Sequence, residues 1–188
     1  ATDVIKANGL MKGVDWFTEL GRERGTAIHA CCDLLFWNHL DWTTVDPRIV
    51  GYVTSCAEWC AHSQFKPQRT EYRAFHPEKL YAGTWDADGD CLQVEDFLFD
   101  LKSGAKEKWH GVQTSAYKEL AAVNGIEIKR RGGLYLQSDG SMAKLYLHED
   151  RNDLKVFLSA LRILQKEEQM RAELEPYRQN LKRWMEAA

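Results

Sequence analysis

Two aspartates and a lysine near the ends of two expected strands are the first candidates for chemistry. Asp86 ends one such segment, and Asp100 and Lys102 close the next. Because alternate residues of a strand point to the same side, Asp100 and Lys102 should project together while Leu101 points into the core. Neighbouring carboxylates repel unless a cation lies between them, and such oxygen ligands suit Mg²⁺ or Mn²⁺. A lysine beside the cation can stabilise charge on a phosphoryl oxygen or help to activate the attacking water.

The surroundings of Asp100 matter because an acid–x–lysine triplet is a weak signal by itself. The same triplet begins at Glu127 and at Asp153, and for an isolated case a solvated surface ion pair is the simpler interpretation. Asp153 lies in an expected helix, where residues two apart do not face each other. The triplet at Asp100 instead closes a buried-looking strand and follows a strand that ends in Asp86, which favours a site there.

Polar residues on two expected helices complete the candidate set. Gln113 and Tyr117 are four apart and share one helix face, so they could hold the lysine or bind a DNA phosphate. A surface pair at the rim of the core is the alternative. His29 could supply a nitrogen ligand to a second cation, although a lone histidine on a helix is more often structural. Arg22 or Arg24 could reach a phosphate.

Four motifs, taken in order along the chain, resemble those of the PD-(D/E)XK nuclease superfamily. They are Gly25-Thr26-x-x-His29, Gly83-Thr84-Trp85-Asp86, Asp100-Leu-Lys102-Ser-Gly and Gln113-x-x-x-Tyr117, and they span residues 25–117, about half of the chain. Within the superfamily the similarity is closest to the RecB-like branch, which includes phage-type exonucleases and the Cas4 nucleases. The resemblance implies an α/β (α+β) fold with a central mixed β-sheet flanked by helices, a restriction-endonuclease-like nuclease core.

The resemblance also implies a role for each matching residue. Asp86, Asp100 and Lys102 would be catalytic, and one or two Mg²⁺ or Mn²⁺ ions would be bound by His29, Asp86, Asp100 and the backbone carbonyl of Leu101. Gln113 and Tyr117 would support the lysine, and Arg22, Arg24 and Ser103 would contact DNA. Glu71 would touch the metal, directly or through water, or remain an exposed strand carboxylate. Relatives that bind an iron–sulfur cluster carry cysteines after the nuclease core. This chain has no cysteine beyond Cys91, so no iron–sulfur cluster is expected.

Composition and charge narrow the class of protein. The 188 residues are 44% hydrophobic and 28% charged, which is enough apolar material for a folded core and excludes a disordered or disulfide-stapled chain. The net charge is −3, yet seven basic and only three acidic residues lie between Lys102 and Arg131. This stretch is either a solvated face or a surface for an anion. With no long apolar segment, we expect a soluble cytoplasmic protein that does not bind membranes.

The cysteines allow a competing interpretation. Cys56 and Cys60 share one helix face, and together with Cys31 and Cys32 they could bind zinc or an iron–sulfur cluster. However, both pairs fall on apolar helix stripes, where cysteine is commonly a small core residue. The odd number of cysteines, five, favours reduced thiols.

The pattern of apolar residues predicts helices, then strands, then a helix, strands and final helices. The first expected helix carries Val4, Leu10 or Met11, Val14 and Phe17, and Gly21 interrupts it. A second helix is expected over 25–40, and Asp46-Pro47 opens a third. Strands over 69–75 and 80–86, a tight turn at Asp88-Gly89, and strands over 91–94 and 97–102 come next. A helix over 110–124, a hairpin over 126–147 about Ser138-Asp139-Gly140, and helices from about Asn152 and Pro176 complete the chain. We predict one nuclease domain over 1–188, with a helical part (1–64), a catalytic sheet and helix (68–147) and C-terminal helices (150–188).

These expectations converge on a metal-dependent deoxyribonuclease, most simply an exonuclease acting on single- or double-stranded DNA ends in recombination, repair or phage replication, with oligomers possible. A structure- or sequence-specific endonuclease of the same fold and a non-catalytic nucleic-acid-binding protein are the rivals. Trp85 or Trp109 could stack an unpaired base, although a buried tryptophan is the commoner case.

Overall fold

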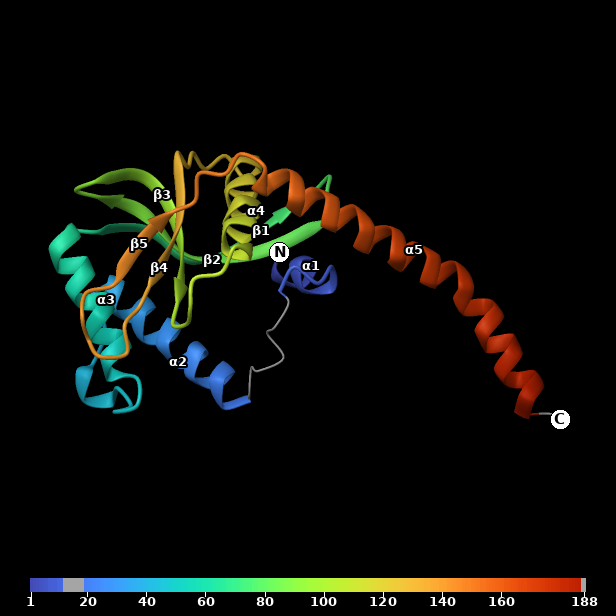
Figure 1. The fold of residues 1–188 in the computed structure, drawn as a ribbon, viewed down its shortest axis with the longest axis horizontal. Helices are drawn as coiled ribbons and strands as arrows, with labels where there is room; N and C mark the ends of the chain where they lie inside the picture. Colours follow the sequence, from blue (N-terminus) through green and yellow to red (C-terminus); the bar gives the residue numbers. More distant parts are fainter. Residues whose placement is uncertain (12–18, 187–188) are drawn as a thin grey trace.

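A mixed five-stranded β-sheet forms the centre of the computed structural model, which describes residues 1–11 and 19–186 (Figure 1). The strands, which lie in the order β1-β2-β3-β4-β5, are β1 (Lys66–His76), β2 (Tyr81–Cys91), β3 (Val94–Lys102), β4 (Arg130–Tyr135) and β5 (Lys144–Leu147). Neighbouring strands are antiparallel except β3 and β4, which are parallel. The fold is therefore α+β, with helices flanking a mixed sheet, and the predicted fold class is confirmed.

Helices cover both faces of the sheet. They are α1 (Thr2–Ala7), α2 (Glu19–Phe36), the 3₁₀ turn η1 (Trp42–Thr44), α3 (Val50–Ser63), α4 (Trp109–Val123) and α5 (Asp153–Glu186). Helices α2 and α3 pack on one face, whereas α1, α4 and the start of α5 pack on the other (Figure 1). Each face thus has its own hydrophobic core.

Strand β3 shows how alternation assigns its side chains to the two cores. Phe97, Phe99 and Leu101 are buried in the core under α2 and α3, and Leu98 is buried in the core under α4. The prediction that Leu101 points into the core is confirmed. Helix α4 connects β3 to its parallel neighbour β4, as a crossover between parallel strands requires. The segment from β3 to β4 is consequently one β–α–β unit.

Several predicted elements agree with the structure. The helix expected over 110–124 is α4, which ends at Val123 with Asn124 at its C-cap and Gly125 in the left-handed conformation (φ 74°). The hairpin expected over 126–147 is the antiparallel pair β4–β5. The turn expected after His76 is also present.

The N-terminal helices differ from the prediction in their limits. Helix α2 runs through Gly21 without a break and ends at Phe36, so both the interruption and the range 25–40 were wrong. Asp46 does not open α3. Its carboxylate instead accepts the backbone N–H of Arg48 at 2.8 Å and binds the Arg48 guanidinium in a tight turn, and α3 begins at Val50. Val14 and Phe17 lie outside the described residues.

The turn predicted at Asp88-Gly89 was also wrong, because β2 continues through it to Cys91. Asp88 is fully buried and accepts hydrogen bonds from the Trp85 indole (2.6 Å) and from Arg69 of β1 (3.0 Å). A Cβ atom on Gly89 would lie 2.1 Å from the Lys66 carbonyl oxygen. The glycine is therefore needed for close approach of the neighbouring strand and not for a turn.

One long helix, α5, replaces the two helices predicted at the C-terminus. It passes through Pro176, although proline removes one backbone donor from a helix. Pro176 and its neighbours are exposed, so water can satisfy the freed carbonyl. Beyond its first turns the helix projects away from the body (Figure 1). Among the helices that the structure describes, none has the length and apolar character needed to cross a membrane.

Candidate metal and catalytic site

The candidate site lies where β2 and β3 separate. The ladder between these strands runs from Cys91–Val94 to Ala87–Phe99 and stops there. Beyond that point the carboxylate of Asp86 accepts the backbone N–H of Leu101 directly. The gap opens into a hollow of about 570 Å³ lined by residues of α2, β2, β3 and α4, among them His29, Asp86, Asp100, Lys102 and Gln113.

The alternation of side chains along β2 is broken at Asp86. Trp85 belongs to the core under α4, whereas Ala87, two residues away, belongs to the core under α2 and α3. The register between β1 and β2 is the same on both sides of this position, with Thr70 opposite Ala87 and Tyr72 opposite Trp85. The Asp86 carboxylate is directed into the gap, where it accepts the Leu101 N–H.

Asp100 and Lys102 project together from β3, as the strand period predicts. The Lys102 ammonium forms an ion pair with Asp100 and donates to the Gln113 side-chain oxygen at 2.8 Å. The Gln113 amide in turn donates to the Tyr117 hydroxyl (2.8 Å) and to the Thr2 hydroxyl (3.1 Å). Two acceptors, Asp100 and Gln113, therefore fix the position of Lys102. The lysine ammonium also lies 5.0 Å from the centre of the Trp109 ring.

The electrostatics of Asp100 favour a bound cation. The Asp100 side chain is only 7% exposed. Burial and then the charge of Asp86 raise its pKa above the usual range, while Lys102 and His29 oppose the rise only in part. A divalent ion beside Asp86 and Asp100 would remove this unfavourable interaction.

A second group of ligands meets at the α2 end of the gap. The His29 ring nitrogen Nδ1 lies 3.0 Å from an Asp86 oxygen, and one ligand atom each of His29, Glu71 and Asp86 lies within 4.8 Å of the others. Burial opposes the charged form of His29, but the Asp86 carboxylate outweighs it and raises the His29 pKa to about 9. The protonated His29 side chain therefore lies beside the carboxylates, at the position where a metal cation is expected.

Glu71 reaches this group through an unusual backbone conformation. It lies inside β1 with φ +46°, in the left-handed region that non-glycine residues rarely adopt. Burial, followed by the charge of Asp86, raises the pKa of its carboxyl group, and His29 lowers it. Strained residues of this kind persist where the surrounding structure holds them, often at functional sites.

The Leu101 carbonyl faces the same gap. The N–H and C=O groups of one strand residue point to the same edge of the strand, and the Leu101 N–H is directed at Asp86. The Lys102 carbonyl points the other way, to β4, and accepts the Leu136 N–H at 2.8 Å. The gap thus brings together Leu101, Asp86 and Asp100, the three predicted oxygen ligands.

The predicted DNA-contacting residues lie at the rim of this region. Arg24 and Ser103 line the hollow, and the Arg24 guanidinium lies 5.8 Å from the centre of the Tyr52 ring. Arg22 is exposed and lines an adjoining depression together with Glu71 and Ser103.

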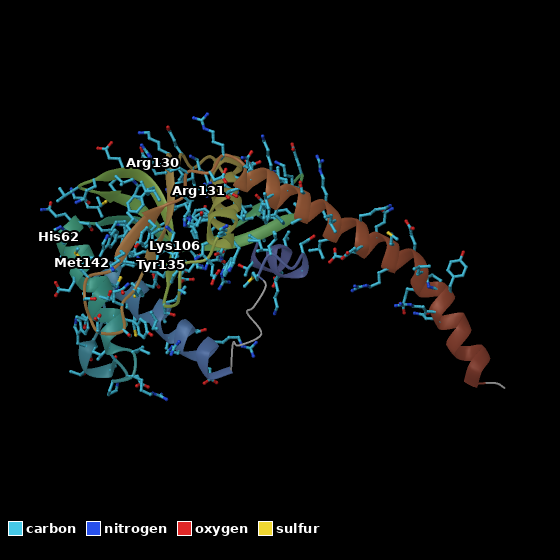
Figure 2. All side chains as sticks on the ribbon, in the orientation of Figure 1. His62, Lys106, Arg130, Arg131, Tyr135 and Met142 are labelled. Carbon is cyan, nitrogen blue, oxygen red and sulfur yellow. The ribbon has the colours of Figure 1, made fainter. Side chains whose placement is uncertain are left out.

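The basic residues from Lys102 to Arg131, interpreted from the sequence as either a solvated face or a surface for an anion, are not gathered in one hollow. Lys102 lines the site, whereas Lys118 and residues 129–131 line a separate hollow. Arg131 is buried and binds the Gly111 carbonyl oxygen and Asp153, so it fastens α5 to α4. Figure 2 likewise shows Arg130 and Arg131 apart from Lys106.

The tryptophans and cysteines are largely structural. Trp85 is fully buried against Tyr72 and cannot stack a base, whereas Trp109 borders the hollow. Cys32 and Cys56 are buried in the core between α2 and α3. Hydrogen bonds from neighbouring cysteine sulfurs and burial raise the pKa of the Cys56 thiol. Among the described residues, the group whose ligand atoms could hold a metal ion contains His29, Glu71 and Asp86 and no cysteine.

Two site residues were missed by the sequence analysis. Thr2 reaches Gln113 from the far end of the chain, and no local pattern connects them. His110 is buried beside the hollow, and its Nδ1 lies 2.7 Å from the Tyr135 hydroxyl. Burial and the charge of Lys102 lower the His110 pKa to about 3. Its position three residues before Gln113, on the same helix face, was the available signal.

Comparisons with known proteins find a likeness to solved structures but none to a family or curated sequence. No protein-family model and no curated protein matches the sequence. The crystal structure of a "putative exonuclease" from Eubacterium rectale is similar over 87% of this chain and 70% of that chain, with a TM-score of 0.49 and 13% sequence identity. The functional assignment therefore depends on the residues of the site.

Proposed function

We propose that this chain is a divalent-cation-dependent deoxyribonuclease of the PD-(D/E)XK superfamily, RecB-like branch, which hydrolyses phosphodiester bonds from DNA ends. The observation that carries the proposal is the convergence of Asp86, Asp100 and Lys102 in one hollow with His29 and Glu71 beside them. These groups come from α2, β1, β2 and β3, so chance surface pairing does not account for them. Residues 1–188 would act as one nuclease domain in the cytoplasm, with DNA as the partner.

The donor set fits Mg²⁺ or Mn²⁺. Asp86, Asp100 and the Leu101 carbonyl offer hard oxygen ligands at one position, and His29, Glu71 and Asp86 offer a nitrogen and two carboxylates at a neighbouring one. Burial and the charge of Asp86 raise the pKa of the Asp100 carboxyl group, and the positive charge of Lys102 offsets this rise only in part. A bound cation would supply the remaining positive charge. When bound, such an ion would polarise the phosphodiester and make water a better nucleophile.

The protein's own residues would supply orientation and charge. Lys102, held by Asp100 and Gln113, would donate a hydrogen bond to a phosphoryl oxygen and stabilise the negative charge that develops there. Tyr117 and Gln113 would keep its ammonium at that place. Arg22, Arg24 and Ser103 would bind backbone phosphates at the rim without reading base sequence.

Action on ends is proposed from the resemblance of the motifs to those of phage-type exonucleases. The rival endonuclease keeps the same residues and differs only in the DNA it accepts. A non-catalytic binding protein would not need Lys102 fastened beside two carboxylates, which argues for turnover.

A cleavage assay tests the proposal. End-labelled linear single- and double-stranded DNA and closed circular DNA are incubated with Mg²⁺ or Mn²⁺ and wild type, Lys102→Ala or Lys155→Ala. Lys155 is the matched control, because it ends another acid–x–lysine triplet but lies exposed on α5. We expect wild type and Lys155→Ala to degrade linear DNA alike, and Lys102→Ala to lose at least about a hundredfold in rate.

Three other results of this assay would contradict parts of the proposal. Cleavage of the closed circle would replace the exonuclease by the endonuclease. DNA binding without cleavage by wild type with either metal would contradict nuclease activity altogether. Equal rates for Lys102→Ala and wild type would remove Lys102 from the reaction.

A further inference from the structure

Helix α5 carries an apolar stripe along the part that leaves the body. The helix packs on the body through its first turns, where Phe157, Ala160 and Leu161 are buried. Its last described hydrogen bond to the body joins the Gln165 side chain to the Lys79 carbonyl at 2.8 Å. Every side chain described from 166 to 179 is exposed. This projecting part is visible at the right of Figure 1.

The apolar residues of this helix recur with the heptad spacing of a coiled coil. A spacing of seven residues separates Val156, Ile163, Met170 and Tyr177 in turn. Leu174 lies four residues after Met170 and three before Tyr177, which is the alternating spacing of a heptad repeat. Met170 and Leu174 are about half exposed and Tyr177 is 73% exposed. In the sequence the spacing continues at Leu181 and Trp184. A repeat over four heptads is typical of a helix that pairs with another helix.

We propose that α5 pairs antiparallel with α5 of a second copy of this chain. The apolar stripe would form the seam, with Ile163 of one copy opposite Leu174 of the other. Pro176 falls on the outer side of the helix in this heptad frame, so it does not interrupt the seam. Glu167 is the polar residue of the stripe, and one polar seam position restricts the register at some cost in stability.

Charge complementarity identifies a second copy as the occupant. Lys166 and Glu173 flank the seam on the same side. In the antiparallel register with Ile163 opposite Leu174, Lys166 of each copy faces Glu173 of the other, giving two opposite-charge pairs. A parallel pair would instead put Lys166 beside Arg171 and Glu173 beside Arg178 of the other helix, so two repulsive pairs would offset two attractive ones. The charges therefore favour the antiparallel arrangement.

A groove on the body accommodates the far end of the partner helix. It lies between α1 and the start of α5, has a volume of about 380 Å³ and is lined by Leu10, Val156, Ala160 and Ile163 among others. In the proposed register Tyr177 of the second copy lies opposite Ala160, at this groove. The most exposed apolar side chain of the stripe would thus be covered by the body of the other copy.

Size-exclusion chromatography with light scattering tests the proposal, because it gives the mass of the eluting species and the monomer mass is 21.7 kDa. We expect wild type at twice this mass and Leu174→Glu at the monomer mass. Ala172→Glu is the matched control, because it adds the same residue to an exposed position on the opposite side of the helix and should remain dimeric. Circular dichroism verifies that both variants keep the helix and sheet content of the wild type. A monomeric wild type, or a Leu174→Glu variant that stays dimeric, would overturn the proposal.

Charge reversal tests the direction of pairing. Lys166→Glu and Glu173→Lys should each weaken the dimer by about tenfold, and the double variant should restore it. In a parallel dimer Lys166→Glu would strengthen association instead, because it would face Arg171, and this result would refute the antiparallel arrangement.

Discussion

The carboxylate of Asp86 accepts the backbone N–H of Leu101, fifteen residues further along the chain. This contact replaces the ladder hydrogen bonds that end at Ala87 and Phe99. It thereby keeps β2 and β3 apart while filling the space between them with a charged group. The same carboxylate binds His29, so the structural and the proposed chemical roles of Asp86 reside in one side chain.

Substitution of Asp86 separates these two roles. Asp86→Asn keeps an oxygen that can accept the Leu101 N–H but loses the charge, so Mn²⁺ binding by calorimetry should disappear while stability is little changed. Asp86→Ala leaves a buried N–H without an acceptor and should cost about 1–3 kcal/mol in the free energy of unfolding. Urea unfolding compares the two variants, and equal stability of Asn and Ala would show that the bond to Leu101 does not support the fold.

Gln113 is expected to act as a positioning residue for Lys102. Gln113→Ala removes the acceptor that holds the ammonium and should lower kcat by about tenfold to a hundredfold while leaving KM nearly unchanged. Gln113→Glu retains an acceptor and should recover most of the rate. Gln165→Ala, which removes an amide contact on α5, is the control. A Gln113→Ala enzyme that changes only in KM would contradict the positioning role.

The left-handed backbone of Glu71 predicts a difference between two substitutions. Glycine adopts this conformation without a steric penalty, so Glu71→Gly should be more stable than Glu71→Ala by about 1 kcal/mol. Both variants lose the carboxylate and should weaken Mn²⁺ binding to a similar extent. Thermal unfolding and calorimetry on the pair measure the two effects, and a more stable Ala variant would mean that the backbone relaxes when the carboxylate is removed.

The buried His110 predicts a pH dependence of stability. Its pKa is lowered to about 3 in the folded protein, against 6.5 for an ordinary histidine. Between these values the unfolded chain binds a proton that the folded chain does not, so stability falls as pH decreases from about 6.5, by at most about 1.4 kcal/mol per pH unit. His110→Gln should reduce this slope in urea unfolding measured from pH 7 to pH 4. An unchanged slope would show that His110 binds its proton equally well in the folded and unfolded states.

Much of the sheet and α4 could be predicted because their signals are local. The apolar run at 97–101 marks a central strand, and Asn124-Gly125 marks the end of a helix. Ordinary strand and helix periods also place Asp100 with Lys102 and Gln113 with Tyr117, and the structure brings these pairs together.

What could not be predicted depends on contacts distant in sequence. Asp88-Gly89 has the composition of a turn, but Arg69 from β1 neutralises Asp88 and the close approach of Lys66 requires the glycine. The left-handed conformation of Glu71 has no signal in its neighbours. The contact between Thr2 and Gln113 needs the whole fold. The role of each residue in catalysis remains a prediction.

The β3–α4–β4 unit carries only part of the residues that the proposed activity requires. Asp100, Lys102 and Gln113 all belong to this unit, whereas His29 and Asp86 precede the exposed tip at Leu92. Severing the polypeptide at that hairpin would leave most metal ligands on one fragment and the lysine with its supports on the other. Neither piece would carry a complete reaction centre, so any cleavage recovered on mixing them would report reassociation of the halves.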